Sequence, residues 1–244
     1  MRRREGGQPS SRFCHRGFWL PILVLLVGSL LIRCWDLDLV VQRSFWWAQE
    51  GWRLAGLRWI GLLYHYGCLP ALVVGVAGCI VWAVSFRFAF LGRVRLFAGF
   101  LGITLMLGPG LLINGILKDH YGRLRPRQVQ EFGGEGTYRP LGEPTFDGAG
   151  KSFPSGHAAM GFYWFAPAIY LWDRRRRLAQ GMMIVALVHG GLMSFGRLAQ
   201  GAHWLSDVWW SAGLVYLCSQ FFYRALWRDL DRNAGSSPTD SFRT

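Results

Sequence analysis

Charged residues are scarce in this chain of 244 residues, and acidic residues are the scarcest of them. Charged residues make up 17 %, with 14 Asp and Glu against 27 Lys and Arg, so the formal net charge is +13. Hydrophobic residues reach 52 %, including 13 Trp and 17 Phe, which is high for a soluble domain. Because the apolar residues lie in long runs, the basic excess indicates a membrane protein with basic loops and disfavours a nucleic-acid partner.

Cysteine is also sparse, and its spacing excludes two kinds of site. The five cysteines are odd in number and scattered, without the spacing of metal ligands. This argues against a zinc site and against a disulfide scaffold. Cys34 and Cys68 fall near the outer ends of the first two apolar runs, so a bond between them remains an alternative in an oxidising compartment.

Six apolar runs predict an all-α, polytopic membrane protein. Each of the last five has roughly 17 to 22 residues, enough at about 1.5 Å per residue to cross a core of about 30 Å. No small-residue cleavage site follows the first run, which favours a retained helix over a signal peptide. The runs are residues 18–32, 68–86, 96–117, 156–172, 178–196 and 203–222.

These runs define the predicted organisation. Residues 1–16 form a basic cytoplasmic N-terminus, residues 17–222 a six-helix transmembrane domain, and residues 223–244 a cytoplasmic tail that is disordered in part. Residues 33–67 are rich in Trp and predict one or two helices on the membrane surface, with an ordinary packed loop as the alternative. Residues 118–155 form a long glycine-rich loop, and we expect it to be a wall or lid for substrate.

The basic residues predict the orientation. With the N-terminus in the cytoplasm, six crossings leave 16 of the 27 Lys and Arg residues on the cytoplasmic side, including the run at 174–177. This orientation puts three polar clusters on the other face of the membrane. The clusters occupy residues 118–126, 154–157 and 197–207.

The clusters contain the residue types that hold and attack a phosphate. Arginine presents a planar fork that matches phosphate oxygens, and lysine adds a point charge. The cations in question are Lys118, Arg125 and Arg197, and each alone could equally be a cation snorkelling to the membrane surface.

The second and third clusters add a helix N-terminus and a histidine pair. Ser155, Gly156 and His157 lie where the loop enters an apolar run, so free N–H groups could bind an anion there, although Ser155 is equally a helix cap. His203 and Asp207 are four residues apart, so on a helix Asp207 can accept a hydrogen bond from one ring nitrogen. The other nitrogen is then free as a nucleophile, unless the pair is structural.

Taken together, the clusters resemble the type 2 phosphatidic acid phosphatase superfamily of membrane lipid phosphatases. That family has K-x6-R-P, then P-S-G-H, then S-R-x5-H-x3-D. Residues 118–126 and 154–157 match the first two elements fully. Arg197, His203 and Asp207 match the third, but Gly196 stands where the family often has Ser.

The resemblance implies a role for each residue. His203 attacks the phosphorus and forms a phosphohistidine, Asp207 orients it, and His157 protonates the leaving oxygen and then activates water. No metal or other cofactor is expected. A non-catalytic protein that binds anionic lipid is the alternative, and a haloperoxidase with the same motifs is disfavoured by the six spans. The expected phosphate ligands are Lys118, Arg125, Ser155, the Gly156 amide and Arg197.

The loop after the first cluster is similar to that of bacterial lipid A phosphatases. The similarity rests on residues 122–127, Phe-Gly-Gly at 132–134, Tyr-Arg-Pro at 138–140 and Asp-Leu-Asp at 36–38. It implies lipid A as substrate and a bacterial inner-membrane enzyme whose site faces the periplasm. Undecaprenyl pyrophosphate, phosphatidylglycerol phosphate and transfer of the phosphate to a second lipid remain alternatives, and the oligomeric state is open.

Overall fold

The computed structural model describes residues 12–146, 148 and 150–227, and these residues form helices and loops without a strand. The predicted all-α fold is therefore confirmed for this part of the chain. The longer helices are α1 (Arg12–Cys34), α4 (Leu69–Val84), α5 (Arg95–Leu105), α9 (Arg176–Ala199) and α10 (Leu205–Phe222). The shorter ones are α2 (Leu37–Arg43), α3 (Arg58–Tyr66), α6 (Lys118–His120), α7 (Gly156–Phe162) and α8 (Phe165–Leu171).

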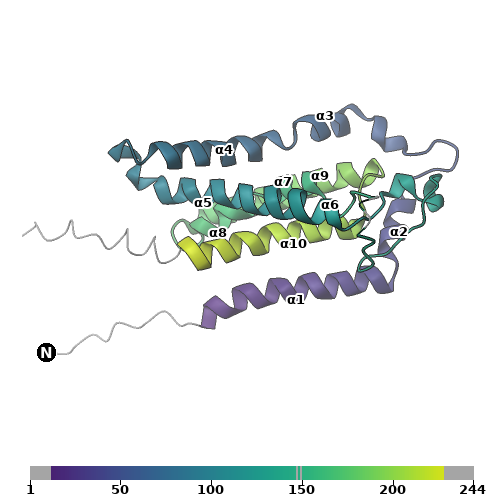
Figure 1. The fold of residues 1–244 in the computed structure, drawn as a ribbon, viewed down its shortest axis with the longest axis horizontal. Coiled ribbons are helices and arrows are strands. Elements are labelled where there is room, and N and C mark those ends of the chain that lie inside the picture. Colours follow the sequence, from purple (N-terminus) through teal and green to yellow (C-terminus); the bar gives the residue numbers. More distant parts are fainter. Residues whose placement is uncertain (1–11, 147, 149, 228–244) are drawn as a thin grey trace, which may run out of the picture.

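The longer helices run lengthwise beside one another, and α2 and the loops gather at one end (Figure 1). α4 packs along α5, α7 and α8 pack on α9, and α1 packs on α10. α7, α8 and α10 form the interior, where Ala158, Phe162, Phe165 and Val215 belong to one buried cluster. The bundle is thus built around the helices that lead away from the second and third polar clusters.

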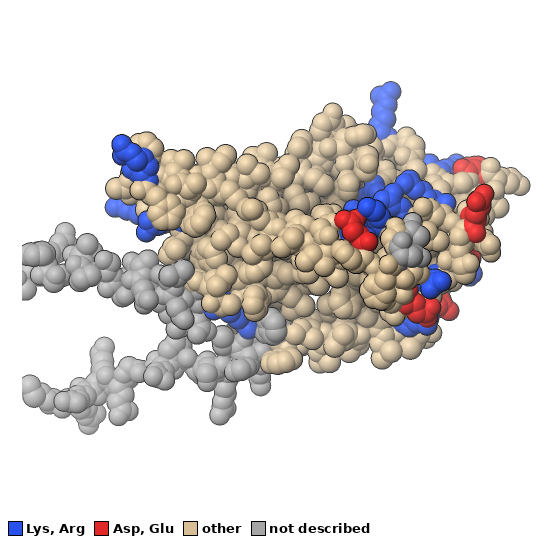
Figure 2. Space-filling model, in the orientation of Figure 1, with Lys and Arg blue, Asp and Glu red and all other residues tan. Residues whose placement is uncertain are grey.

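An apolar surface surrounds the middle of the bundle. Leu20, Val73, Ile80, Ile184 and Leu187 are large, apolar and exposed on α1, α4 and α9. On the face in Figure 2, Lys, Arg, Asp and Glu gather toward the two ends of the bundle. Such a belt between charged ends is typical of a protein whose helices lie in a bilayer.

Three helices in the described part of the chain are long and apolar enough to cross a membrane, namely Arg58–Val84, Arg95–His120 and Arg176–Ala199. A fourth is added if α1 and α2, which meet at 68°, count as one span. α7, α8 and α10 do not qualify, because α7 and α8 have only seven residues each and α10 has serines and Asp207 on its buried side. Six spans therefore stay a prediction.

Two predicted boundaries were wrong. α3 and α4 are separated only by Gly67 and Cys68 and together form one 27-residue candidate span, Arg58–Val84, so this span begins earlier than the predicted residue 68. Residues 156–172 are not one helix either. Pro167 lacks the N–H that would bond the Tyr163 carbonyl, so α7 ends before α8 begins.

The ends of the chain also differ from the prediction. The helix after α10 continues as η6 (Tyr223–Trp227), and Trp227 Nε1 donates a hydrogen bond to the Leu96 carbonyl at 2.7 Å. The first five residues of the predicted tail are therefore helical, and its remaining residues, 228–244, lie outside the described part. α1 already begins at Arg12, while residues 1–11 of the predicted N-terminus are not described.

A wide helical segment connects α5 to the first polar cluster. η3 (Met106–Leu117) is a π-helix, and Pro109 within it cannot donate an intrahelical hydrogen bond. Asn114 Nδ2 donates a hydrogen bond to the Pro109 carbonyl at 2.7 Å, and its Oδ1 lies 3.4 Å from Lys118 Nζ. The π-helix η3 thus ends just before Lys118, which lies at the end of the bundle where the loops gather.

Candidate active site

A cavity of about 450 Å³ opens among the loops at this end of the bundle. Its volume is in the range of small-molecule sites, which is about 300–1,000 Å³. The lining contains four cationic side chains, two histidines and no carboxylate. The lining residues are Ala55, Tyr64, Lys118, Arg125, Arg127, His157, Arg197, Gln200 and His203. The structure therefore brings together five of the eight predicted site residues, which come from segments far apart in the sequence.

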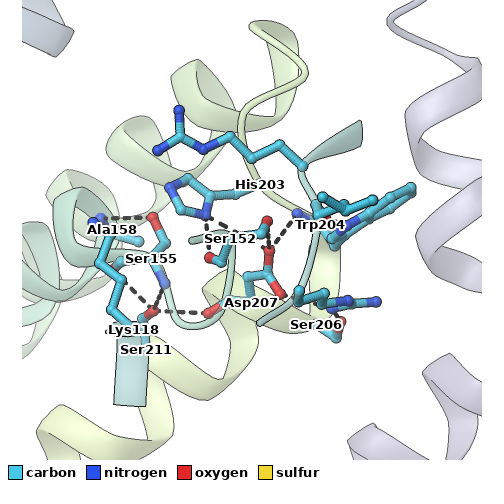
Figure 3. A network of polar contacts seen from close by, with 12 residues as sticks. Lys118, Ser152, Ser155, Ala158, His203, Trp204, Ser206, Asp207 and Ser211 are labelled. Carbon is cyan, nitrogen blue, oxygen red and sulfur yellow. Dashed lines mark hydrogen bonds and ion pairs between the residues drawn. The ribbon is translucent and has the colours of Figure 1, made fainter. Parts of the chain in front are cut away.

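His203 precedes α10 and is almost fully buried (Figure 3). Its Nδ1 lies 2.6 Å from the Ser152 carbonyl oxygen. A carbonyl oxygen only accepts hydrogen bonds, so Nδ1 must carry the proton and Nε2 keeps its lone pair. Burial lowers the pKa of His203 to about 4, even though Asp207 raises it. The ring is thus neutral at pH 7, as a nucleophile requires.

Asp207 lies behind His203 and contacts it indirectly. Its Oδ2 is 3.6 Å from His203 Nδ1, too far for a hydrogen bond. The same oxygen accepts hydrogen bonds from Ser152 Oγ at 2.5 Å and from the Trp204 N–H at 2.8 Å. The predicted direct bond from His203 to Asp207 is therefore replaced by a route through Ser152, while the carboxylate charge remains close to the ring.

Arg123 forms a buried ionic network that sequence reasoning missed. Its Nη1 lies 2.6 Å from Asp207 Oδ1 and its Nη2 lies 2.7 Å from Asp38 Oδ2. The guanidinium also stacks on the Trp204 ring, with its carbon 5.3 Å from the ring centroid. Burial by itself would lower the pKa of Arg123, but the charges of Asp207 and Asp38 together raise it by more. The net shift of this pKa is therefore upward, and Arg123 stays charged. The one feature of the sequence that pointed to this network was the pair of acidic residues at 36 and 38, next to an apolar run.

Arg197 and His157 are held by Tyr64, a second residue that sequence reasoning missed. The Tyr64 ring stacks on His157 with centroids 5.0 Å apart and planes 11° apart. The guanidinium carbon of Arg197 lies 4.9 Å from the centroid of the same ring, and its Nη1 donates to Gln200 Oε1 at 2.6 Å. The buried Arg197 Nε has no hydrogen-bond partner among the described residues. An oxyanion in the cavity could accept from it.

Arg125 and Arg127 add charge at the cavity, together with Lys118. Burial, and then the charge of Arg127, lower the pKa of Arg125. Arg127 is exposed and received no role in the prediction. Together with Arg197, these residues make the cavity strongly positive, which suits a multiply charged anion.

Ser155 and Gly156 do not line the cavity. The Ser155 hydroxyl accepts a hydrogen bond from the Ala158 N–H at 3.4 Å, so it is the N-cap of α7. Gly156 packs against the Asn114 side chain, where any larger residue would collide. The capping alternative is confirmed for Ser155, and contact of either residue with phosphate stays a prediction.

Other candidate residues are engaged elsewhere. Asp119 Oδ1 pairs with Lys151 Nζ at 2.8 Å, and His120 Nδ1 lies 2.7 Å from the Ile116 carbonyl. Within residues 12–227, apart from the undescribed 147 and 149, no group of three His, Cys, Asp or Glu side chains is placed to hold a metal ion. Cys34 and Cys68 are free thiols, so the alternative disulfide is not formed.

These motifs and the helical bundle define a class of membrane phosphatase. The family profile described as PAP2 superfamily matches residues 97–231, more than half of the chain, and the chain belongs to this superfamily. This confirms the family that the three sequence motifs predicted.

Two curated relatives are similar to about half of the chain. The lipid A 4'-phosphatase of Francisella tularensis subsp. novicida (strain U112) is 36 % identical over 131 residues, or 53 % of this chain and 58 % of the relative. The lipid A 4'-phosphatase of Rhizobium leguminosarum is 37 % identical over 121 residues, or 46 % and 49 %. The chain thus spans about half the length of the curated relatives it matches.

A solved structure has a similar fold. The transmembrane PAP2-type phosphatidylglycerolphosphate phosphatase from Bacillus subtilis superposes with a TM-score of 0.51 at 18 % identity. The superposition covers 93 % of this chain and all of that one. At this identity the likeness concerns the fold alone.

Proposed function

We propose that the protein is an integral membrane lipid phosphatase that acts through a phosphohistidine on His203. The observation that carries the proposal is the hydrogen bond from His203 Nδ1 to the Ser152 carbonyl. It leaves Nε2 unprotonated on a ring that lines a cavity with four cations. A site that only bound an anionic lipid would need the cations but not an oriented, neutral imidazole.

In the proposed first step, His203 Nε2 attacks the phosphorus. His157 must be protonated for this step, yet burial and then the charge of Arg197 lower its pKa to about 4 in the free protein. We therefore expect the bound anionic phosphate to raise that pKa, so that His157 takes up a proton with the substrate. A P–N bond then forms, the P–O bond to the lipid breaks, and the protonated His157 gives its proton to the leaving oxygen. The phosphorylated imidazole becomes positive, and the Asp207 carboxylate 3.6 Å from Nδ1 stabilises it. In the second step His157 takes a proton from water, the water oxygen attacks phosphorus, and the P–N bond breaks to release phosphate.

The cationic residues stabilise the charge on the transferring phosphoryl group. Lys118, Arg125 and Arg197 come from three different segments and converge on one cavity. Fixed positive groups in a site of low dielectric stabilise a transition state more strongly than water does. We expect activity to persist in the presence of a chelator such as EDTA, measured as phosphate release. Complete loss that added Mg²⁺ restores would contradict metal independence.

The proposed substrate is lipid A, in the inner membrane of a bacterium with the site facing the periplasm. Both sequence relatives described above are named lipid A 4'-phosphatases, which supports this choice. The position of the cavity at one end of an apolar bundle suits a phosphate presented at a membrane surface. Phosphatidylglycerol phosphate, undecaprenyl pyrophosphate and transfer to a second lipid are alternative outcomes of the same assay.

The test is phosphate release by protein purified in detergent, with lipid A, undecaprenyl pyrophosphate, phosphatidylglycerol phosphate and phosphatidic acid offered separately. We expect the highest kcat/KM with lipid A. His203→Ala should lower it at least about a thousandfold and His157→Ala at least about a hundredfold. His120→Gln is the matched control, because His120 is exposed and does not line the cavity. Near-normal rates in either cavity variant would overturn the mechanism, and no release from any lipid would overturn the function.

A further inference from the structure

The short helix α2 carries two buried polar side chains one turn apart. Asp38 is 2 % exposed and Gln42 is fully buried, although α2 lies outside the residues that the family profile matches. Buried polar groups are destabilising unless they are paired. Asp38 is paired with Arg123 and Ser206, which adjoin Asp207, and Gln42 Nε2 is paired with the His203 main chain. Gln42 Oε1 has no hydrogen-bond partner among the described residues.

Gln42 holds the main chain of the nucleophile. Its Nε2 donates a hydrogen bond to the His203 carbonyl oxygen at 2.6 Å. His203 lies between α9 and α10 and is not part of either helix, so its own carbonyl has no helical partner. The hydrogen bond from Gln42 therefore fixes a backbone that neither helix fixes.

Asp38 binds the groups behind Asp207. Its Oδ2 accepts hydrogen bonds from Arg123 Nη2 at 2.7 Å and from Ser206 Oγ at 2.6 Å. Its Oδ1 accepts from the Ser206 N–H in the first turn of α10 at 2.8 Å. Arg123 Nη1 in turn lies 2.7 Å from Ser206 Oγ and 2.6 Å from Asp207 Oδ1.

The charges of this network explain why a second carboxylate is needed. If the buried Arg123 were paired with Asp207 alone, its positive charge would cancel the negative charge of Asp207. Little net negative charge would then remain to interact with His203. Asp38 adds a second negative charge, so the group of three carries a net charge of −1 at the rear of the ring. In a medium of low dielectric such a residual charge acts strongly on an imidazole that becomes positive when it is phosphorylated.

We propose that α2 is a positioning element for catalysis. Asp38 balances Arg123 so that the charge of Asp207 remains available to His203, and Gln42 holds the His203 backbone in the attacking geometry. The proposal rests on the proposed role of His203 as nucleophile. Neither side chain lines the cavity, so both act through other residues rather than on the substrate.

The first test compares Asp38→Asn with Asp36→Asn. Asp36 lies two residues earlier, is exposed and has no side-chain capping bond, so its variant should match the native protein. Asp38→Asn should lower kcat by roughly tenfold or more, in line with other buried partners of active-site groups. KM and inhibition by inorganic phosphate should stay within about twofold, because the cavity cations are unchanged. Equal kcat values for the two variants would overturn the proposal.

A second variant separates charge balance from a merely structural role. In Asp38→Asn, Arg123 cancels Asp207. The net charge of residues 38, 123 and 207 is then zero. Adding Arg123→Gln removes the positive charge of Arg123 and returns the net charge of these three residues to −1. The double variant should therefore be several-fold more active than Asp38→Asn alone. If it is equally or less active while its thermal unfolding in detergent is no lower, the charge-balance argument fails.

Gln42→Met tests the other contact without changing charge. It removes the hydrogen bond to the His203 carbonyl and keeps a similar volume, so kcat should fall several-fold with KM unchanged. An unchanged kcat would overturn the role of Gln42. All variants are compared with native protein on the substrate that it hydrolyses best. Failure of the native protein to release phosphate would refute the proposed function, whereas failure of these variants to lose activity would refute only the role of α2.

Discussion

One carbonyl oxygen determines the chemistry available to His203. Because the Ser152 carbonyl can only accept, it selects the tautomer with the proton on Nδ1. Asp207 contributes twice, by holding the Ser152 hydroxyl at 2.5 Å and by placing its charge near the ring. At the scale of single residues, the site is therefore a nucleophile oriented by a backbone group and stabilised by a buried charge.

The first prediction concerns the protonation of His203. Burial lowers its pKa to about 4, against an ordinary value of about 6.5. The charged groups that face it are Asp207, which raises the pKa, and Arg197 and Lys118, which lower it. A group with a lowered pKa loses its proton early as pH rises, so the ring should stay neutral from pH 8 down to about pH 5.

The measurement is the ring-nitrogen NMR spectrum of protein labelled with ¹⁵N-histidine, assigned by the signal missing in His203→Gln. We expect the pattern of a neutral ring with the proton on Nδ1 throughout that pH range. An imidazolium pattern at pH 6, or a proton on Nε2, would contradict the orientation described above.

The second prediction concerns the Tyr64 ring, which stacks on His157 and lies against the Arg197 guanidinium. Tyr64→Phe keeps the ring and should leave kcat/KM within about twofold. Tyr64→Leu removes both ring contacts and should lower kcat/KM roughly threefold to tenfold. Steady-state phosphate release measures both. Equal loss in the two variants would show that the hydroxyl, and not the ring, matters.

The residues that sequence could predict are those in fixed local patterns. His203 and Asp207 are four residues apart where α10 begins, and the cations stand at or near helix ends, so their spacing in the sequence groups them. Asp38, Gln42 and Tyr64 reach the site only by packing of segments many residues away, and no local pattern reports such contacts. Ser152 contacts His203 through its carbonyl, which is common to every residue type, so this contact leaves no trace in the sequence.

At the scale of elements, glycine decides how closely α7 approaches α9. Gly190 on α9 packs against the Phe162 ring of α7, so an added methyl group would collide with the ring. The neighbouring Gly191 has open space around the position of a side chain. The apolar runs predicted where most of these helices lie, but hydrophobicity alone did not reveal the break before Pro167 or the continuation of α3 into α4.

The third prediction uses these two adjacent glycines. Gly190→Ala should lower the free energy of unfolding by about 1–3 kcal/mol through overpacking. Gly191→Ala should leave it unchanged or raise it by up to about 1 kcal/mol, because alanine favours helix. Thermal unfolding in detergent, followed by circular dichroism, measures both. A similar melting temperature for the two variants would contradict the close packing of α7 on α9.

At the scale of the whole molecule, the candidate site lies at one end of the bundle, and the basic hairpin that contains η2 (Ala89–Arg93) joins α4 to α5 at the other (Figure 1). The apolar belt between the two ends supports the proposed position in a membrane. The sequence predicted that the polar clusters and this basic hairpin lie at opposite ends of the bundle, because the positions of the basic residues between the apolar runs can be read directly from the sequence. The predicted count of six spans stays a prediction, since the buried helices α7, α8 and α10 face protein and need not be strongly apolar to lie in a membrane.

The fourth prediction tests the orientation of the bundle. Two exposed positions, Thr137 in the long loop and Phe90 in the hairpin, are each replaced by a single cysteine in a cysteine-free protein. A membrane-impermeant maleimide should label Thr137→Cys in intact spheroplasts. It should label Phe90→Cys only after the membrane is permeabilised. The reverse pattern would place the site in the cytoplasm.

The central claim is that phosphate passes through His203. The most direct measurement mixes His157→Ala protein with ³²P-labelled p-nitrophenyl phosphate, whose leaving group needs no proton from His157. Alkaline quenching within the first turnover should show one p-nitrophenol released per enzyme and an alkali-stable, acid-labile label in the peptide that contains His203. Release of p-nitrophenol without that label, or with the label on another residue, would contradict the account.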